Sequence, residues 1–289
     1  MRKFAVIDVG SNSVRLLFVA DGKVLYKALN TTRLGEGLAE KPVLLDTAVL
    51  RTANAVAEFA LRAKREGAEN VYAFATAAVR SAENRQDFLS AVKTLAGIDV
   101  EVLSGEEEAR LGLLGALGTK DGAVCDVGGA STEIIVKAQG VLRYKKSVDV
   151  GVVRIKDKYG RDKTEMEKGL LKSCESFNDC PKIKEIVGIG GTATTIASIV
   201  LGLTSYDAEK VTGATITRAE MSALADKLAK LSVSEIEAFP CMPKGRADVL
   251  LGGVVWLALL MDALGIERMR VSDRDNLEGY ALQRGFMHE

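Results

Sequence analysis

The strongest constraint on the fold of this chain is an internal repeat. Residues 5–17 read AVIDVGSNSVRLL and residues 123–135 read AVCDVGGASTEII. At the same offset, GKVLYK at 22–27 falls on GVLRYK at 140–145. Each copy has the pattern of an apolar strand, an Asp-x-Gly turn, an alternating second strand, a short turn and a third strand. Two copies predict two domains with the same topology.

After each three-strand unit, helical spacing alternates with short strand-like runs, which predicts an α/β fold with a mixed sheet and covering helices in each half. The helices are expected at 46–67, 85–95, 106–117, 164–177, from 192, at 217–231, at 246–265 and from about 277. The later strands are expected at 70–75, 99–103, 185–188 and 269–271. The join at 119–122 reads as a tight turn, so we expect domains at 1–118 and 119–289 facing each other across a cleft, with the last helix (277–289) packing back on the first domain.

Composition excludes several classes of protein. Lys plus Arg and Asp plus Glu balance at 39 each, so the chain has no global positive field for nucleic acid or an anionic membrane. The longest apolar run, 249–261, contains two glycines and is shorter than the roughly 20 residues needed to cross a bilayer. The N-terminus lacks a secretory pattern, which predicts a cytoplasmic protein.

The cysteine and histidine content bounds the chemistry. The four cysteines form no CxxC pair, and the single histidine, His288, is next to the C-terminus, which excludes a zinc site and a histidine relay. Reduced thiols are expected, with a Cys174–Cys180 bridge as the alternative. The chemistry must therefore depend on carboxylates, hydroxyls, arginine and backbone amides.

The two Asp-x-Gly turns are the first candidate site. Each places a carboxylate at the end of a buried strand, where a charge requires a partner or a metal ion. The following residues would present amides and a hydroxyl to an oxyanion, namely Gly10, Ser11, Asn12 and Ser13 in the first turn and Gly128, Gly129 and Ser131 in the second. A single such turn could be a simple hairpin. The repetition at one register favours a phosphate-binding role.

The paired loops resemble those of the actin-like ATPase superfamily, and within it the exopolyphosphatase and guanosine pentaphosphate phosphohydrolase (Ppx/GppA) family. The segments IDVGSNSVRLL, ATAAVR, LSGEEEARL, CDVGGASTEI, GIGGTATT and VSDRDNLEG follow in family order. The chain departs from the family at Ala130 and Asn276 and lacks the helical C-terminal domains of longer members. The resemblance implies two actin-like (ribonuclease H-like) lobes, each with a mixed five-stranded sheet, and an active site in the cleft between them.

The resemblance also implies roles for the acidic residues. Glu108 takes the position of the catalytic glutamate that polarises the attacking water, with Glu107 as the alternative. Ser104 and Glu107 also form the pattern of a helix capping box. Asp126 and Glu133 would hold Mg²⁺, directly or through water, and Asp8, directed at the same phosphate, is the third metal candidate. The competing interpretation of Glu133 is an exposed strand residue. Mg²⁺ suits so small a set of carboxylates because it keeps several waters.

The remaining candidates are cations and a glycine-rich turn. Arg80 would grip phosphate bidentately, and Arg15 and Arg33 are weaker candidates. Gly190, Gly191 and Thr192 would direct amides at a phosphate from the start of a helix. The same turn fits G-x-G-x-x-A with Asp207 downstream, but a dinucleotide fold does not explain the repeat. No Walker A motif is present.

These observations predict an exopolyphosphatase, a Mg²⁺-dependent hydrolase that releases terminal phosphate from polyphosphate. The first alternative is a guanosine pentaphosphate (pppGpp) phosphohydrolase. Further alternatives are a sugar- or acetate-kinase-like phosphotransferase and a non-enzymatic, actin-like nucleotide-binding protein. A homodimer is compatible with this fold class, as is a monomer.

Overall fold

A computed structural model describes residues 2–38 and 40–288. The chain forms two compact units: unit 1 comprises Met1–Gly118 with Asn276–Glu289, and unit 2 comprises Thr119–Asp275. The chain passes from unit 1 to unit 2 after Gly118 and returns before Asn276. Unit 1 is therefore built from two separate segments of sequence.

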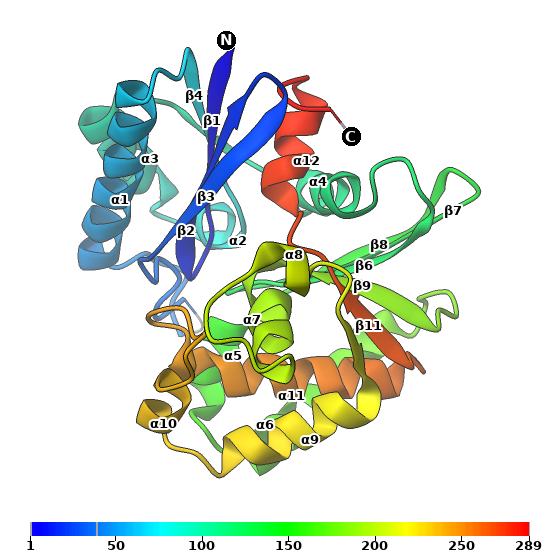
Figure 1. The fold of residues 1–289 in the computed structure, drawn as a ribbon. Helices are drawn as coiled ribbons and strands as arrows, with labels where there is room; N and C mark the ends of the chain where they lie inside the picture. Colours follow the sequence, from blue (N-terminus) through cyan, green and yellow to red (C-terminus); the bar gives the residue numbers. More distant parts are fainter. Residues whose placement is uncertain (1, 39, 289) are drawn as a thin grey trace. The chain divides into compact units, whose positions relative to one another are not determined.

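Unit 1 contains a mixed sheet of order β3-β2-β1-β4-β5. Its first three strands form an antiparallel meander, and the other two run parallel to β1. The strands are β1 (Lys3–Val9), β2 (Ser13–Ala20), β3 (Lys23–Thr31), β4 (Asn70–Ala75) and β5 (Val100–Val102). Helices α1 (Asp46–Arg65) and α3 (Arg85–Ala96) lie to one side of the sheet, and α4 (Gly105–Leu117) and α12 (Asn276–Gln283) to the other (Figure 1). A short helix, α2 (Ala77–Ser81), follows β4.

The alternation of side chains along β1 divides the interior of unit 1 into two cores. Ala5, Ile7 and Val9 belong to the core that includes α1 and α3, whereas Val6 packs with residues of α4 and α12. Because successive side chains point to opposite faces, Asp8 shares the face of Val6. The sequence of β1 therefore directs a carboxylate toward the side of the sheet that carries α4.

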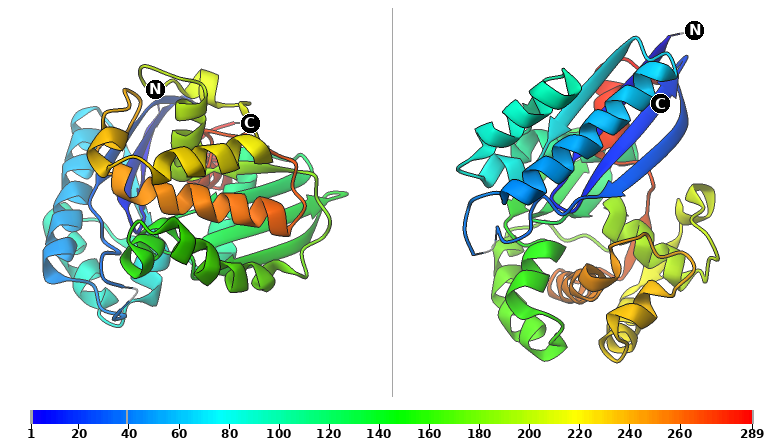
Figure 2. Two further views of the ribbon diagram at one scale, coloured as in Figure 1. Left: turned by 90° about the horizontal axis from the view of Figure 1, so that it is seen from below. Right: turned by 90° about the vertical axis from the view of Figure 1, so that its left-hand side faces the viewer.

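Unit 2 contains a six-stranded mixed sheet of order β10-β11-β9-β6-β7-β8. Its strands are β6 (Gly122–Val127), β7 (Thr132–Ala138), β8 (Val141–Val148), β9 (Glu185–Ile189), β10 (Thr215–Thr217) and β11 (Arg268–Val271). Its helices are α5 (Val152–Tyr159), α6 (Lys163–Cys174), α7 (Gly190–Val200), α8 (Ala208–Val211), α9 (Arg218–Ala229), α10 (Val233–Glu237) and α11 (Ala247–Ala263), with a 3₁₀ turn at Glu175–Phe177. Helix α11 lies between α9 and the α5–α6 pair (Figure 2), which explains why it is apolar on nearly all sides.

The sequence repeat is a structural repeat. Strands β6, β7 and β8 form the same antiparallel meander as β1, β2 and β3. The register of the outer strand pair shifts between Phe18 and Val19 in the first copy and between Val136 and Lys137 in the second, which are equivalent positions. The α/β fold with two mixed sheets is confirmed.

Several details differ from the sequence expectation. The second sheet has a sixth strand, β10, whose three residues are too few to show a period of two. Helices α2, α5, α8 and α10 were also not predicted, because eight or fewer residues give little helical periodicity. The four cysteines are free thiols, so Cys174 and Cys180 are not bridged. Every helix in the described part of the chain is too short or too polar to span a bilayer.

Candidate active site

The first Asp-x-Gly loop is a tight turn supported by the segment that follows β3. The Gly10 amide donates to the Ser13 carbonyl at 3.0 Å, and the amides of Thr32 and Arg33 both donate to the Asn12 carbonyl. Among the described residues, the Ser11 and Asn12 amides donate to no backbone carbonyl. The buried Asn12 Oδ1 also has no hydrogen-bond partner there. The loop thus presents unused polar groups on a fixed backbone.

The second loop repeats this construction. The Gly128 amide donates to the Ser131 carbonyl, again at 3.0 Å, and the amides of Val152 and Val153 donate to Gly128 and Gly129. A side chain at Gly151 would place its first carbon 2.4 Å from the Gly129 carbonyl carbon, so glycine is required for this approach. The start of α5 therefore supports the second loop as the segment after β3 supports the first.

A hydrogen-bonded chain anchors the second loop in the core of unit 2. The indole Nε1 of the buried Trp256 donates to Thr132 Oγ1 at 2.8 Å, and Thr132 Oγ1 donates to the Val150 carbonyl. Thr132 directly follows the loop, and Val150 immediately precedes the glycine that packs on it. The loop position is thus tied to the buried helix α11.

The two repeats place different charges beside their equivalent aspartates. Asp8 lies opposite Arg15 on β1 and β2, and Arg15 Nε donates to Asp8 Oδ2 at 3.0 Å. Asp126 lies opposite Glu133 on β6 and β7. The first pair is an ion pair, whereas the second is a pair of carboxylates. Opposed like charges are unfavourable on a sheet, and a cation between them removes the conflict.

The carboxylates of Asp126 and Glu133 are chemically suited to bind a magnesium ion. Both are hard oxygen donors on neighbouring strands, and two carboxylates leave room for the waters that Mg²⁺ retains. Ser147 Oγ donates to Glu133 Oε1 at 2.6 Å and orients that carboxylate. Glu133 is 1% exposed, so its interpretation as an exposed strand residue is wrong. In the described part of the chain, no group of three or more His, Cys, Asp or Glu side chains forms a complete protein cage for a metal.

Glu107 and Glu108 have different environments although they are neighbours. Glu107 closes the predicted capping box with Ser104, and the Ser104 backbone amide and hydroxyl lower the pKa of Glu107. Glu108 is 7% exposed and faces the sheet. Burial raises the pKa of Glu108 and the charge of Asp8 raises it further, while Arg80 and the Thr76 hydroxyl act in the opposite direction. Glu107 serves the helix, and Glu108 belongs to a buried polar cluster with Asp8.

Arg80 lies in that cluster. Its Nη1 donates to Glu108 Oε2 at 2.9 Å and to the Leu103 carbonyl at 2.9 Å. Its side chain remains about a quarter exposed, at 26%. The structure thus brings together Asp8, Arg80 and Glu108, which are far apart in the sequence. Arg80 holds the catalytic candidate, a contact that the sequence analysis did not predict.

The glycine-rich turn opens α7 next to Asp126. Gly190 has φ +76°, and a Cβ there would lie 2.6 Å from Asp126 Oδ1. Glycine is therefore required both by the backbone conformation and by the close approach of the carboxylate. The buried Thr192 hydroxyl donates to the Val127 carbonyl at 2.7 Å. Thr192 therefore joins α7 to the end of β6, and the amides at the helix start are the groups suited to an anion.

Arg246 is the residue of this region that the sequence analysis missed. A Cβ at Gly191 would lie 1.9 Å from Arg246 Nη1, so the guanidinium packs directly on the first turn of α7. A cation beside the positive end of a helix dipole favours an anion between them. Nothing in the surrounding sequence, PKGRAD, predicts this contact, because Arg246 is far from α7 in the sequence and meets it only in the folded protein.

The dinucleotide interpretation of the same turn is wrong. The turn follows the fourth strand of unit 2 and not the first βα turn of a domain. The carboxylate of Asp207 accepts from the amides of Glu209 and Lys210 and caps the short helix α8. Asp207, the candidate ribose-binding acid, is therefore a local helix cap.

Two units of mixed α/β topology, each with an Asp-x-Gly loop, define a phosphate-handling protein of the actin-like fold class. The family model described as the Ppx/GppA phosphatase family matches residues 6–284, and the chain belongs to this family of phosphoanhydride hydrolases. The chain is similar to the Mycobacterium tuberculosis protein named Exopolyphosphatase 2, with 29% identity over 98% of each chain. It is also 30% identical to a guanosine-5'-triphosphate,3'-diphosphate pyrophosphatase of Photobacterium profundum, over 99% of this chain and 59% of that protein. The crystal structure of the Aquifex aeolicus Ppx/GppA family member superposes with a TM-score of 0.79 and 28% identity, covering 98% of this chain and 97% of the other.

Proposed function

We propose that this protein is an exopolyphosphatase that hydrolyses the terminal phosphoanhydride bond of inorganic polyphosphate. The observation that carries the proposal is the buried Glu108, held by Arg80 and facing the Asp8 loop. The similarity of the whole protein to Exopolyphosphatase 2, over 98% of both chains, supports polyphosphate as the substrate.

In the proposed mechanism, Glu108 orients a water for in-line attack on the terminal phosphorus and accepts its proton. A carboxylate whose pKa is raised by burial is a stronger base than an exposed one, which suits this role. Ser11, Asn12 and Ser13 in the first loop and Gly129 and Ser131 in the second bind phosphate oxygens through amides and hydroxyls, as does the turn at Gly190. The amides of Gly10 and Gly128 donate within their own loops, so these two glycines shape the loops. Arg80 keeps Glu108 in place through Nη1, and the rest of its guanidinium remains the candidate for a phosphate oxygen.

Asp126 and Glu133 would hold Mg²⁺, which when bound neutralises charge on the phosphate oxygens. Asp8, through its contact with Arg15, sets the charge around Glu108 and the first loop. In this proposal Glu133→Gln raises the Mg²⁺ concentration for half-maximal activity by about tenfold or more. A Ser147→Ala variant, which removes only the hydrogen bond to Glu133, produces a smaller shift. An unchanged Mg²⁺ requirement in Glu133→Gln would remove Glu133 from the metal site.

The second candidate substrate is pppGpp, because the Photobacterium relative is named for that type of compound. Both substrates present a terminal phosphoanhydride to the same residues, so the site chemistry is shared. We place the enzyme in the cytoplasm, with reduced thiols.

Phosphate release with Mg²⁺ from long-chain polyphosphate, pppGpp and ATP tests the proposal directly. We expect release from polyphosphate, and a loss of about 10²–10⁴ in turnover for Glu108→Gln. Glu107→Gln serves as the matched control because it removes a neighbouring carboxylate that only caps the helix. Preference for pppGpp would change the substrate and keep the site, whereas full activity of Glu108→Gln would remove the catalytic assignment. Acceptor-dependent transfer from ATP would indicate a kinase, and no release with nucleotide-dependent assembly would indicate an actin-like protein.

A further inference from the structure

Strand β3 forms an outer edge of the unit 1 sheet. The sheet order begins β3-β2, and among the described strands β2 alone pairs with Lys23–Thr31. A single bridge between Gly22 and Met287 lies just before the strand. The strand has nine residues, against about five or six in a typical strand. Its outer N–H and C=O groups therefore form a long edge on which another strand can pair.

Two leucines of this edge strand are exposed to solvent. Leu25 is 58% exposed and Leu29 is 41% exposed. Lys27 lies between them on the same face of the strand and pairs with Glu278 of α12 at 2.6 Å, so this face is the one that carries α12. Helix α12 thus offsets the charge of the lysine and leaves the leucines uncovered. The edge presents apolar side chains next to its outer backbone groups.

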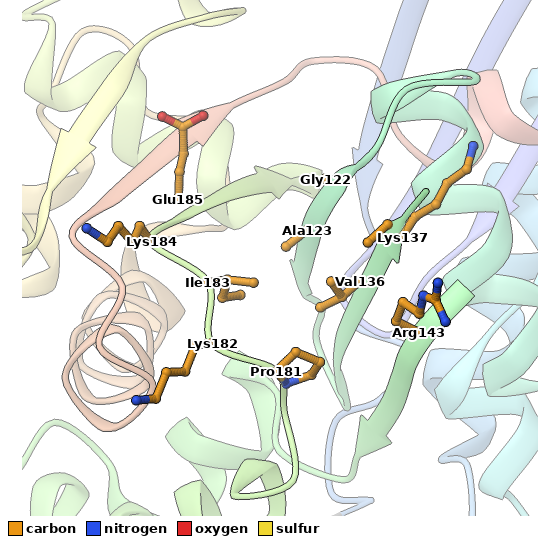
Figure 3. A pocket seen from close by; sticks show the side chains of 11 residues that line it. Gly122, Ala123, Val136, Lys137, Arg143, Pro181, Lys182, Ile183, Lys184 and Glu185 are labelled. Carbon is orange, nitrogen blue, oxygen red and sulfur yellow. The ribbon is translucent and has the colours of Figure 1, made fainter. Parts of the chain in front are cut away.

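The equivalent edge strand of unit 2, β8, carries charge where β3 does not. At the offset of the sequence repeat, three residues of β3 have polar counterparts on β8: Leu25 corresponds to Arg143, Ala28 to Lys146 and Leu29 to Ser147. Figure 3 shows a pocket next to β8, and the charged end of Arg143 is directed away from that pocket. Cationic side chains on an edge strand oppose pairing with another strand. The chain therefore protects one of its two equivalent edges and leaves the other apolar.

The order of side chains along β3 is complementary to itself. Two copies that pair antiparallel around a two-fold axis at Lys27 place Leu25 of each opposite Leu29 of the other. Moving the axis by one residue in either direction places Lys27 opposite a leucine and separates the leucine pairs. In the symmetric register the two Lys27 side chains face each other, but the charge of each is offset by its own buried Glu278. One register is favoured, and the strand that fits it is a second copy of this chain.

We propose that the β3 edge is the interface of a homodimer in which the unit 1 sheets of two copies join into one continuous sheet. Backbone hydrogen bonds between the two β3 strands hold the copies together, and the leucine pairs exclude water beside them. The interface lies along Lys23–Thr31, which includes none of the residues proposed to bind phosphate or Mg²⁺. The dimer is therefore independent of the proposed reaction.

Sedimentation velocity of the full chain tests the proposal. A contact along one strand of each copy belongs with small, reversible interfaces, so we expect a dimer with a dissociation constant of roughly 1–100 μM. The variant L25R/L29S takes the residues that β8 has at these positions and should raise this constant by about tenfold or more. Because both side chains are exposed, the variant should keep its melting temperature and its phosphate release per chain.

The matched control changes the other edge. V141T/L142T removes two exposed apolar side chains from β8 and should dimerise like the unmodified protein. A protein that stays monomeric at millimolar concentration would refute the proposal. So would a L25R/L29S variant that dimerises as the unmodified protein does, or a control that is weakened as much as that variant.

Cysteine cross-linking tests the register. In a mixture of Leu25→Cys and Leu29→Cys proteins, the two new thiols lie opposite each other, within the reach of a disulfide. In Leu25→Cys alone the new thiols are offset by four residues, roughly 13 Å, which a disulfide cannot span. With an added oxidant, we expect a covalent dimer from the mixture and none from Leu25→Cys alone, which also controls for the native cysteines. No covalent dimer from the mixture, or an equal amount from Leu25→Cys alone, would overturn the proposed pairing.

Discussion

At the scale of single residues, the proposed catalytic glutamate is placed where it costs stability. Burial raises the pKa of Glu108, so the folded protein binds its proton more tightly than the unfolded chain does. Protonated Glu108 therefore favours the folded state at low pH, and this contribution is lost as the pH rises through the raised pKa. At neutral pH the charged carboxylate lowers the free energy of unfolding, and it is retained because the proposed reaction requires it.

We expect Glu108→Gln to be more stable than the unmodified protein at pH 8. Glutamine removes the buried charge and keeps an oxygen that can accept from Arg80 Nη1. The difference in melting temperature should decrease with falling pH and vanish near pH 4, where a glutamate of ordinary pKa protonates in the unfolded chain as well. Thermal unfolding of both proteins between pH 4 and 8 measures this. A less stable variant at pH 8 would show that the charge of Glu108 contributes favourably to folding.

The sequence predicts local residue contacts better than distant ones. The Ser104–Glu107 capping box could be read directly, because both partners lie within one helical turn. The Arg80–Glu108 contact joins two segments that no spacing rule connects, and the packing of Arg246 on Gly191 is of the same kind. Such contacts depend on how β4, α4, α7 and α11 pack, which is decided by the whole core.

At the scale of elements, α12 is the immediate neighbour of the helix that carries Glu108. A Cβ at Gly279 would lie 1.9 Å from the Leu111 carbonyl oxygen, so α12 approaches the α4 backbone one turn beyond Glu108. The buried Glu278 next to it pairs with Lys27 Nζ on β3 at 2.6 Å. Helix α12 is thereby held on the sheet and in turn sets the position of α4.

Gly279→Ala should therefore reduce turnover as well as stability. Backbone atoms cannot yield as a flexible side chain can, so α4 must shift, at a cost of about 1–3 kcal/mol in the free energy of unfolding. We expect a lower kcat for polyphosphate with little change in KM, because Glu108 moves and the phosphate loops do not. Steady-state kinetics and urea unfolding measure the two effects.

Gly169→Ala in α6 is the matched control for this variant. It creates an overlap with a side chain, 2.3 Å from the Tyr159 hydroxyl, in unit 2 and away from Glu108. It should lose less stability than Gly279→Ala, because the Tyr159 side chain can move, and it should keep its kcat. If both variants keep full kcat per folded molecule, α12 does not position the catalytic glutamate.

The elements also show where prediction from sequence ends. The duplicated meander was predictable because its strands are long, alternate in polarity and occur twice in one register. The apolar helix α11 was predictable from its composition. The short elements β10 and α8 carry no comparable signal, because their positions depend on pairing with β11 and on the cap at Asp207.

At the scale of the molecule, the core of unit 2 is built from one continuous segment of the sequence, whereas unit 1 has a core built from two separate segments. Among the residues that the structure describes, the core of unit 2 draws only on those between Ala123 and Val271. A core of unit 1 combines Val6, Leu17, Phe74 and Leu111 with Leu277, Tyr280 and Ala281 from the end of the chain. Unit 1 therefore depends on the C-terminal segment for its second core, whereas unit 2 does not.

Deleting residues 276–289 should unfold unit 1 and leave unit 2 folded. The deletion removes two large buried side chains, Leu277 and Tyr280, each worth about 1.5–3 kcal/mol of burial, together with the partner of Lys27. The single tryptophan, Trp256, lies fully buried in unit 2, so its fluorescence reports on that unit alone. We expect an unchanged urea midpoint by Trp256 fluorescence, with new tryptic cleavage in α1 at Arg62 and Lys64. A Trp256 transition that moves to lower urea with the deletion would show that the units fold as one cooperative structure.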